Sequence, residues 1–178
     1  MSLDAPAITM YYRTIDNATN QEIEGYKLIG SKSNFHFGQI NGLYGGESSI
    51  VVEFDIWNNE PALYGGMHTK QVSDAVNCRF TAWDNEELKS SQNIQDKHTK
   101  TPYIRARCVT QEYPDFKAVA GLRSLMSDDL YGSITNDSGV LLGVPGGDHM
   151  IIQTKITLPH YTDPSFKSFV FEFSYDYI

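Results

Sequence analysis

The chain has 178 residues, of which 40% are hydrophobic and 20% charged, so it is too apolar for disorder and long enough to bury a core. Its net charge of −8 and its lack of any Lys/Arg run argue against nucleic acid or an anionic membrane as a partner. No apolar run could span a bilayer, and residues 1–10 lack signal-peptide features. The length of the chain predicts one domain over residues 1–178.

Alternation of apolar and polar residues predicts β-strands along most of the chain. Clusters of Asn, Asp, Gly and Pro separate these segments, as expected for turns. In chain order, the predicted strands are 7–14, 26–30, 34–40, 49–57, 75–83, 103–110, 148–158 and 168–178. Such a series of short strands predicts an all-β fold: a two-sheet antiparallel β-sandwich of the immunoglobulin-like or jelly-roll type.

The segment "SIVVEFDIW" at 49–57 shows the alternation most clearly in the middle of the chain. One face carries the apolar residues Ile50, Val52, Phe54 and Ile56. The other face carries Val51, Glu53, Asp55 and Trp57. This division is typical of a strand with one buried and one polar face.

The two cysteines, Cys78 and Cys108, fall on the apolar faces of the predicted strands 75–83 and 103–110. Two cysteines cannot form a disulfide framework, and they lack the CxxC spacing of zinc ligands. We therefore expect two buried thiols in a protein that folds in a reducing compartment.

One segment, "YPDFKAVAGLRSLMS", has apolar residues at near-helical spacing. Phe116, Val119 and Ala120 share a face in a helix, and Asp115 precedes them as an N-cap. The sequence therefore predicts one short helix near 115–126.

Glu53 and Asp55 lie two residues apart on the polar face of the strand 49–57, which allows three interpretations. The first, which we favour, is a face exposed to solvent or to a partner. Arg105 and Arg107 share a strand face and could meet these carboxylates across strands. Asp148 and His149 could form an acid–base pair, but neighbouring residues of a strand point to opposite faces.

The second interpretation is a metal site. The segment "VVEFDIWNN" resembles the metal-binding strand of L-type lectins, whose pattern is V-E-F-D-T-x-x-N. The resemblance implies Glu53, Asp55 and Asn59 as ligands of calcium or manganese in a carbohydrate-binding module. The family has a further Asp after this strand, whereas this chain has Tyr64, followed by His68.

The third interpretation is catalytic, because sandwich glycosidases resemble this chain in their E-x-D spacing. Their longer signature, E-x-D-x-x-E, requires a carboxylate at the position of Asn58, and Glu60 comes two residues too late. A retaining pair also needs two carboxyl groups about 5 Å apart in a cleft that holds a sugar. Trp57, Tyr64 and Trp83 could serve as aromatic platforms for that sugar.

A wider pattern resembles the small β-sandwich structural proteins of tailed bacteriophages and prophages, found in tails, baseplates and fibres. The resemblance rests on "NFHFGQINGLYGGESSIVVEFDIWNNEP" at 34–61, on "SDAVNCRFTAWD" and on the aromatic strand near residue 178. It implies a non-enzymatic virion subunit, without cofactor, that occurs in the virion and in the host cytoplasm during assembly.

The partners that this resemblance implies are other virion proteins and further copies of the chain, with a surface glycan as a second class. Exposed aromatic residues would make these contacts, since aromatic side chains are enriched in interfaces. The residues that we expect to face a partner are Trp57, Tyr64, Trp83, Tyr103 and Tyr131.

Overall fold

The computed structural model describes residues 2–30, 36–40, 49–61, 70–83, 104–110, 115–118, 138–158 and 170–177. Within these ranges every regular element is a strand. Six strands share one sheet: β1 (Ile8–Ile15), β2 (Glu22–Leu28), β3 (Val51–Asn58), β5 (Ile104–Cys108), β6 (Lys117–Ala118) and β7 (Asp148–Ile156). The second sheet consists of β4 (Val76–Trp83) and β8 (Val170–Asp176).

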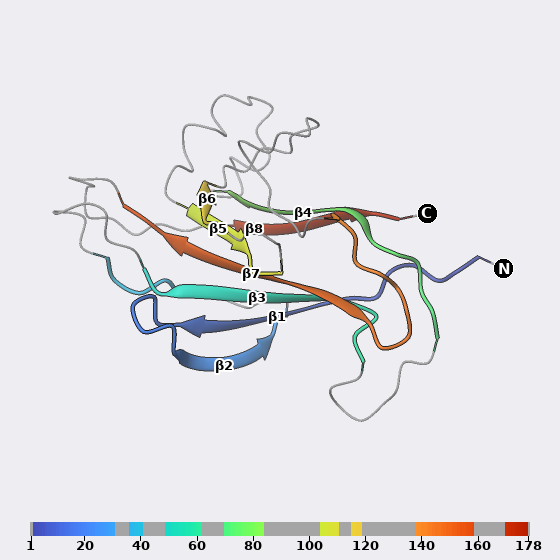
Figure 1. Cartoon of the computed structure of the whole chain (residues 1–178), viewed down its shortest axis with the longest axis horizontal. Helices are drawn as coiled ribbons and strands as arrows, with labels where there is room; N and C mark the ends of the chain where they lie inside the picture. The colour runs from blue at the N-terminus through green and yellow to red at the C-terminus, as the bar shows by residue number, and fades with distance from the viewer. Residues whose placement is uncertain are drawn as a thin grey trace.

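The six-stranded sheet has the order β2-β1-β3-β7-β5-β6, and every neighbouring pair is antiparallel. The antiparallel pair β4-β8 forms a second layer over it (Figure 1). The predicted all-β fold with two antiparallel sheets is therefore confirmed, and the two layers are consistent with a β-sandwich. Its long edge strand is β2, while β6 at the other edge has only two residues.

The core lies between the two sheets and is closed by aromatic rings. Phe54 of β3 lies 5.0 Å from Phe80 of β4 and 5.4 Å from Phe171 of β8, measured between ring centroids. Val52 and Ile56 flank Phe54 and are fully buried. Each such side chain contributes about 1.5–3 kcal/mol when it leaves water, so the apolar face predicted for residues 50–56 holds the sheets together.

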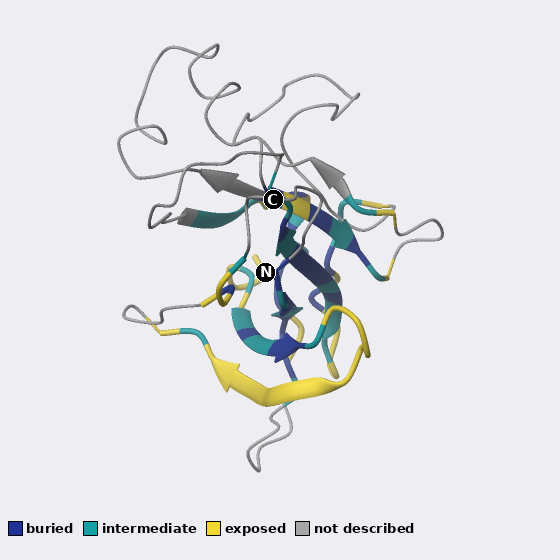
Figure 2. Cartoon of the chain, turned by 90° about the vertical axis from the view of Figure 1, so that its left-hand side faces the viewer, coloured by how far each residue is buried: buried dark blue, intermediate teal, exposed yellow. Residues whose placement is uncertain are grey.

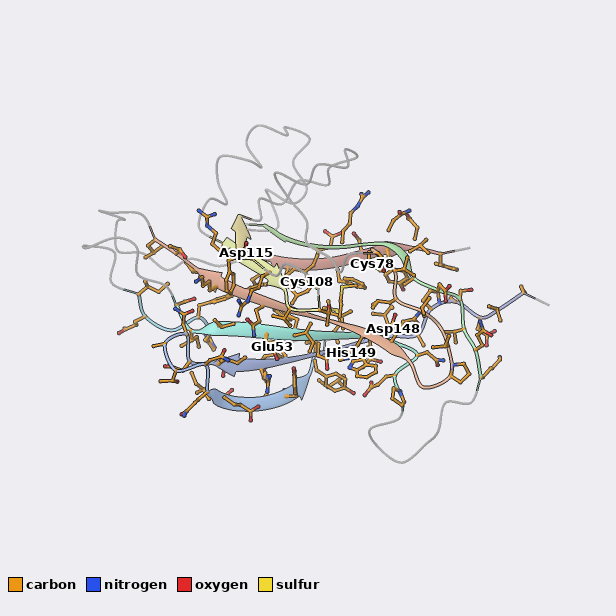
Figure 3. The ribbon with its side chains drawn as sticks, viewed as in Figure 1. Glu53, Cys78, Cys108, Asp115, Asp148 and His149 are labelled. Carbon is orange, nitrogen blue, oxygen red and sulfur yellow. The ribbon has the colours of Figure 1, made fainter. Side chains whose placement is uncertain are left out.

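Both cysteines lie in this core, as predicted (Figure 3). Cys78 is 2% exposed and its Sγ donates to the carbonyl of Ala75, while Cys108 is fully buried. Burial raises the pKa of the Cys78 thiol to about 11. At neutral pH Cys78 is thus a protonated core side chain and a poor nucleophile.

The helix predicted near 115–126 is not seen, and this prediction is wrong at its start. Lys117 and Ala118 form β6, which pairs with Ala106 and Arg105 of β5. The ladder bonds of β5 and the contact of Phe116 with two cations on the sheet favour an extended chain here. Residues 119–126 lie outside the described part, and none of the described residues forms a helix able to cross a membrane.

The boundaries of two other predicted strands also differ from the structure. β2 begins at Glu22, four residues before the predicted start at Tyr26. Residues 36–40, inside the predicted strand 34–40, form no strand. Two register shifts in the β1–β2 pairing break the simple alternation of β2, which is why the pattern revealed only its second half.

Candidate functional site

The outer face of the six-stranded sheet, which points away from β4 and β8, carries a continuous row of polar side chains. The strand register aligns Arg13 of β1, Glu53 of β3, Gln153 of β7 and Arg107 of β5. Residues that are opposite each other in antiparallel strands have side chains on the same face and in contact. The register therefore brings together four polar groups from four strands.

Glu53 is the centre of this row. Its carboxylate accepts hydrogen bonds from Arg13 Nε, Tyr26 Oη and Gln153 Nε2, each at 2.6 Å. The residue is only 2% exposed. The predicted direction of Glu53, away from the core, is confirmed, but the expectation of solvent contact is wrong because the long side chains of the neighbouring strands cover the carboxylate.

The network around Glu53 extends to both sides. Arg13 Nη1 pairs with Glu22 of β2 at 2.9 Å, and its guanidinium lies over the ring of Tyr26, 4.7 Å from the centroid. On the other side, Arg107 Nε donates to Gln153 Oε1 at 2.9 Å. Arg107 thus reaches Glu53 only through Gln153. The network links five strands, from β2 to β5.

Tyr26 gives this network a pH dependence. The hydroxyl of Tyr26 lies against Glu53 although 42% of the residue is exposed. Desolvation of this hydroxyl, followed by its hydrogen bond to Glu53, raises its pKa well above the ordinary value of 10.0. Because the folded state holds this proton more tightly than the unfolded state, the stabilisation is complete below about pH 10 and is lost as the pH rises further.

We expect the Tyr26 hydroxyl to stay protonated in the folded protein until alkali unfolds the chain. The measurement is a titration of tyrosinate absorbance in which the signal of Tyr26→Phe is subtracted from that of the wild type. The difference signal should emerge together with the loss of circular dichroism. Ionisation of Tyr26 near pH ~10 in protein that is still folded would contradict the prediction.

Asp55, the second predicted carboxylate, belongs to a separate contact on the outer face. Its Oδ1 lies 2.7 Å from Nδ1 of His149 on β7. The imidazole in turn stacks on the ring of Trp57, with centroids 4.1 Å apart. Trp57 is partly buried, and its Nε1 has no hydrogen-bond partner among the described residues.

Asp148 and His149 do not act as a pair on one face. Asp148 Oδ2 accepts from the backbone N–H of Leu142, whereas the ring of His149 turns to Asp55. The opposite orientation of neighbouring strand residues, which argued against this dyad, is confirmed.

The end of β3 binds the adjacent loops through two buried asparagines. Asn58 Oδ1 accepts from the backbone N–H of Ala7, and its Nδ2 donates to the carbonyls of Ser73 and Leu141. Asn59 has a φ of 54°, in the left-handed region that Asn tolerates better than most residues. Its Nδ2 donates to the carbonyls of three loop residues: Lys70, Gly143 and Val144.

Two further contacts complete this junction. The hydroxyl of Tyr11 lies 2.8 and 2.9 Å from the two carboxylate oxygens of Glu60. A Cβ on Gly143 would lie 2.2 Å from the carbonyl oxygen of Val72, so only glycine fits at that close approach. Residues 58–60, which include part of the lectin-like motif, thus hold the loops at one end of the sheet.

The geometry favours a structural role for Glu53, Asp55 and Asn59 over a metal site. Glu53 is occupied by three donors and Asp55 by His149, while the side chain of Asn59 turns its Nδ2 to loop carbonyls. Among the described residues, no three or more His, Cys, Asp or Glu side chains are grouped to hold an ion. The residues present therefore do not fit the lectin-like calcium or manganese site.

Small hollows on the described surface also lie away from the predicted carboxylates. One of about 190 Å³ is lined by Leu3, Gln71, Ser73, Asp74 and Val76. Another of about 120 Å³ is lined by Asn77, Arg79, Ser174, Tyr175 and Asp176. Both are smaller than the 300–1,000 Å³ typical of small-molecule sites.

Of the aromatic residues predicted to face a partner, only Trp57 can be placed fully. Trp83 ends β4, where its backbone pairs with Val170 of β8. Tyr64, Tyr103 and Tyr131 lie outside the described residues.

The sequence predicted the edge strand β2 only in part and did not indicate its exposure. All seven of its residues are exposed, and Figure 2 shows it as a yellow strand at the rim of the sheet. Its large apolar side chains Ile23, Tyr26 and Leu28 are 53%, 42% and 58% exposed. The sequence predicts a strand only over residues 26–30, so Ile23 falls outside the predicted strand.

Two features of the described residues therefore bear on function: a closed polar network around Glu53 and an open edge at β2. In comparisons with protein-family models, curated protein sequences and solved structures, no match to this chain was found.

Proposed function

We propose that the protein is a non-enzymatic structural subunit of a tailed-phage or prophage virion, in a tail, baseplate or fibre. It assembles with further copies of itself, and through them with other virion proteins, by pairing along β2. The exposure of every residue of this edge strand is the observation that carries the proposal.

An edge strand presents unpaired backbone N–H and C=O groups to any strand that approaches it. β2 lies at the end of the strand order, and within the described sheet it pairs with β1 on one side. Three large apolar side chains add surface that pairing would remove from water. Burial of such surface is the main driving force of association.

The charges of β2 favour a second copy of the chain as the occupant. Glu24 and Lys27 are opposite Thr14 and Tyr12 of β1, so they lie on one face of the sheet. If a two-fold axis normal to the sheet relates two copies, their β2 strands pair antiparallel. The corresponding faces of the two sheets then lie on the same side. Glu24 of each copy can then lie opposite Lys27 of the neighbouring copy, which forms two opposite-charge pairs per interface.

The sequence resemblance at residues 34–61 supports the virion context, and the two-layered all-β fold suits an immunoglobulin-like or jelly-roll assembly module. Charged residues and bulges on an edge discourage indiscriminate pairing. β2 has both, since it carries Glu22, Glu24 and Lys27, and its pairing with β1 contains two register shifts. These features support a selective partner, and the proposal places the protein in the virion and in the host cytoplasm during assembly.

Sedimentation velocity over a range of protein concentrations tests this proposal. The wild type should self-associate, and Ile23→Lys combined with Leu28→Lys should weaken association at least ~10-fold, equivalent to about 1.4 kcal/mol. Leu142→Lys is the matched control, because Leu142 is 44% exposed but lies outside β2. A wild type that stays monomeric, or a double variant that associates normally, would count against the proposal.

A further inference from the structure

Three cations gather on the outer face near the β6 edge of the large sheet. The register sets Arg105 of β5 opposite Lys155 of β7, and Arg107 opposite Gln153 on the same face. Direct cross-strand neighbours have Cβ atoms about 4.5–5.5 Å apart. Arg105 and Lys155 therefore form a like-charge pair in a chain whose net charge is −8.

No carboxylate neutralises this pair in the part of the chain that the structure describes. The ion pairs there involve Arg13, Lys27, Lys70 and His149, but neither Arg105 nor Lys155. Arg105 is exposed and Lys155 is partly buried. Like charges in direct cross-strand contact destabilise a sheet, so the fold alone gives no reason for this arrangement.

Neighbouring groups hold two of these cations in fixed positions. The ring of Phe116 lies 4.5 Å from the guanidinium carbon of Arg107 and 4.3 Å from Nζ of Lys155, measured to its centroid. Arg107 Nε also donates to Gln153, which fixes the plane of the guanidinium. Burial, followed by the charges of Arg107 and Arg105, lowers the pKa of Lys155. Among the described residues, no ion pair with a carboxylate offsets these effects on the lysine.

We propose that Arg105, Arg107 and Lys155 bind a tetrahedral oxyanion, a sulfate or phosphate group, on this face of the sheet. The guanidinium groups offer paired donors that match such oxygens, and the lysine adds a point charge. Phe116 positions Arg107 and Lys155 before the anion arrives, which lowers the entropy lost on binding. The inference is independent of assembly along β2.

Thermal unfolding in sodium sulfate and in sodium chloride of equal ionic strength tests the site. Sulfate stabilises proteins in general by exclusion from their surface, so the comparison with variants is decisive. The wild type should gain a saturable rise in Tm, on the order of 2–4 °C beyond that of Arg105→Gln and Lys155→Gln. The control is Lys70→Gln, which replaces an exposed lysine outside β2, β5 and β7 and should respond like the wild type. An equal rise in Tm with sulfate in all four proteins would refute the proposed site.

A second outcome separates a binding site from a purely structural cation cluster. In chloride alone, Lys155→Gln should melt at the same temperature as the wild type or above it, because the substitution removes repulsion from Arg105 and Arg107. A lower Tm in chloride, together with an unchanged response to sulfate, would assign Lys155 to packing and overturn the proposal.

Calorimetric titration distinguishes the sources of the oxyanion. The probes are inorganic sulfate, inorganic phosphate and a sulfated oligosaccharide, each added to the wild type and to Lys155→Gln. Binding of the inorganic ions alone assigns the site to a free anion, whereas at least ~10-fold tighter binding of the oligosaccharide assigns it to a sulfated glycan. The absence of binding by all three probes, or binding that Lys155→Gln leaves unchanged, would refute the proposal.

Discussion

Replacing Glu53 by glutamine is expected to lower the free energy of unfolding by about 3 kcal/mol, near the lower end of the cost of breaking a buried ion pair. The carboxylate accepts from Arg13, Tyr26 and Gln153 at once. Glutamine has a single acceptor oxygen, and its NH₂ group would face one of these donors. Arg13 can regain some water, since its side chain is 29% exposed, and this moderates the loss.

Urea unfolding at neutral pH measures this change, with Asp4→Asn as the matched control. Asp4 pairs with Lys70 outside β2, and both side chains are more than half exposed. Ion pairs of that kind add little, so the control should match the wild type within error. Equal midpoints for Glu53→Gln and the wild type would show that the network around Glu53 contributes nothing to stability.

Replacing Asn58 by alanine is expected to cost about 2–4 kcal/mol, because it combines a cavity with unsatisfied buried groups. The amide satisfies one backbone N–H and two carbonyls, which belong to Ala7, Ser73 and Leu141. Asn58 is fully buried, so water cannot replace these bonds without disruption of the loops. Denaturant unfolding measures the cost.

Two variants sharpen the test at Asn58. Asn17→Ala removes an exposed turn asparagine and should leave the unfolding midpoint unchanged. Asn58→Asp keeps the acceptor for Ala7 but turns an oxygen toward the carbonyls of Ser73 and Leu141, so it should be at least as harmful as alanine. A mild effect of Asn58→Asp would mean that these carbonyls do not depend on the amide.

The alternation of side chains was sufficient to predict the core face of the sheets. Val52, Phe54 and Ile56 are buried because successive strand residues point to opposite faces, which is a local property that a sequence displays directly. The burial of Cys78 and Cys108 followed from the same rule. A binary pattern of this kind also identified the all-β class.

The exposure of side chains on the outer face could not be predicted from this alternation. Whether Glu53 meets water depends on the side chains of the strands beside it. Its partners lie 27, 40 and 100 residues away in the chain, at Tyr26, Arg13 and Gln153. Asp55 and His149 are similarly 94 residues apart. Strand order and register, which a single sequence does not display, decide these contacts.

Two local predictions failed because tertiary contacts outweigh weak patterns. The spacing of Phe116, Val119 and Ala120 suits a helix, yet pairing with β5 extends the chain at Lys117. In β2 the register shifts interrupt the alternation between Glu22 and Tyr26. A bulge changes the face of every following side chain relative to the simple period, so pattern matching lost the first half of this strand.

The polar network and the proposed interface are physically connected. Tyr26 and Glu22 of β2 bind Glu53 and Arg13, so the network fixes the edge strand to the interior of the sheet. An edge strand held in this way loses less conformational entropy when a partner adds a strand. The closed network would therefore support the proposed assembly along β2.

Hydrogen–deuterium exchange of the β2 amides, compared between dilute and concentrated protein, tests the central claim most directly. If copies pair along β2, those amides of Glu22–Leu28 that point away from β1 should exchange more slowly in the assembled protein, while those of Asp148–Ile156 in the sheet interior stay unchanged. Assemblies whose β2 amides exchange as fast as those of the monomer would contradict the account.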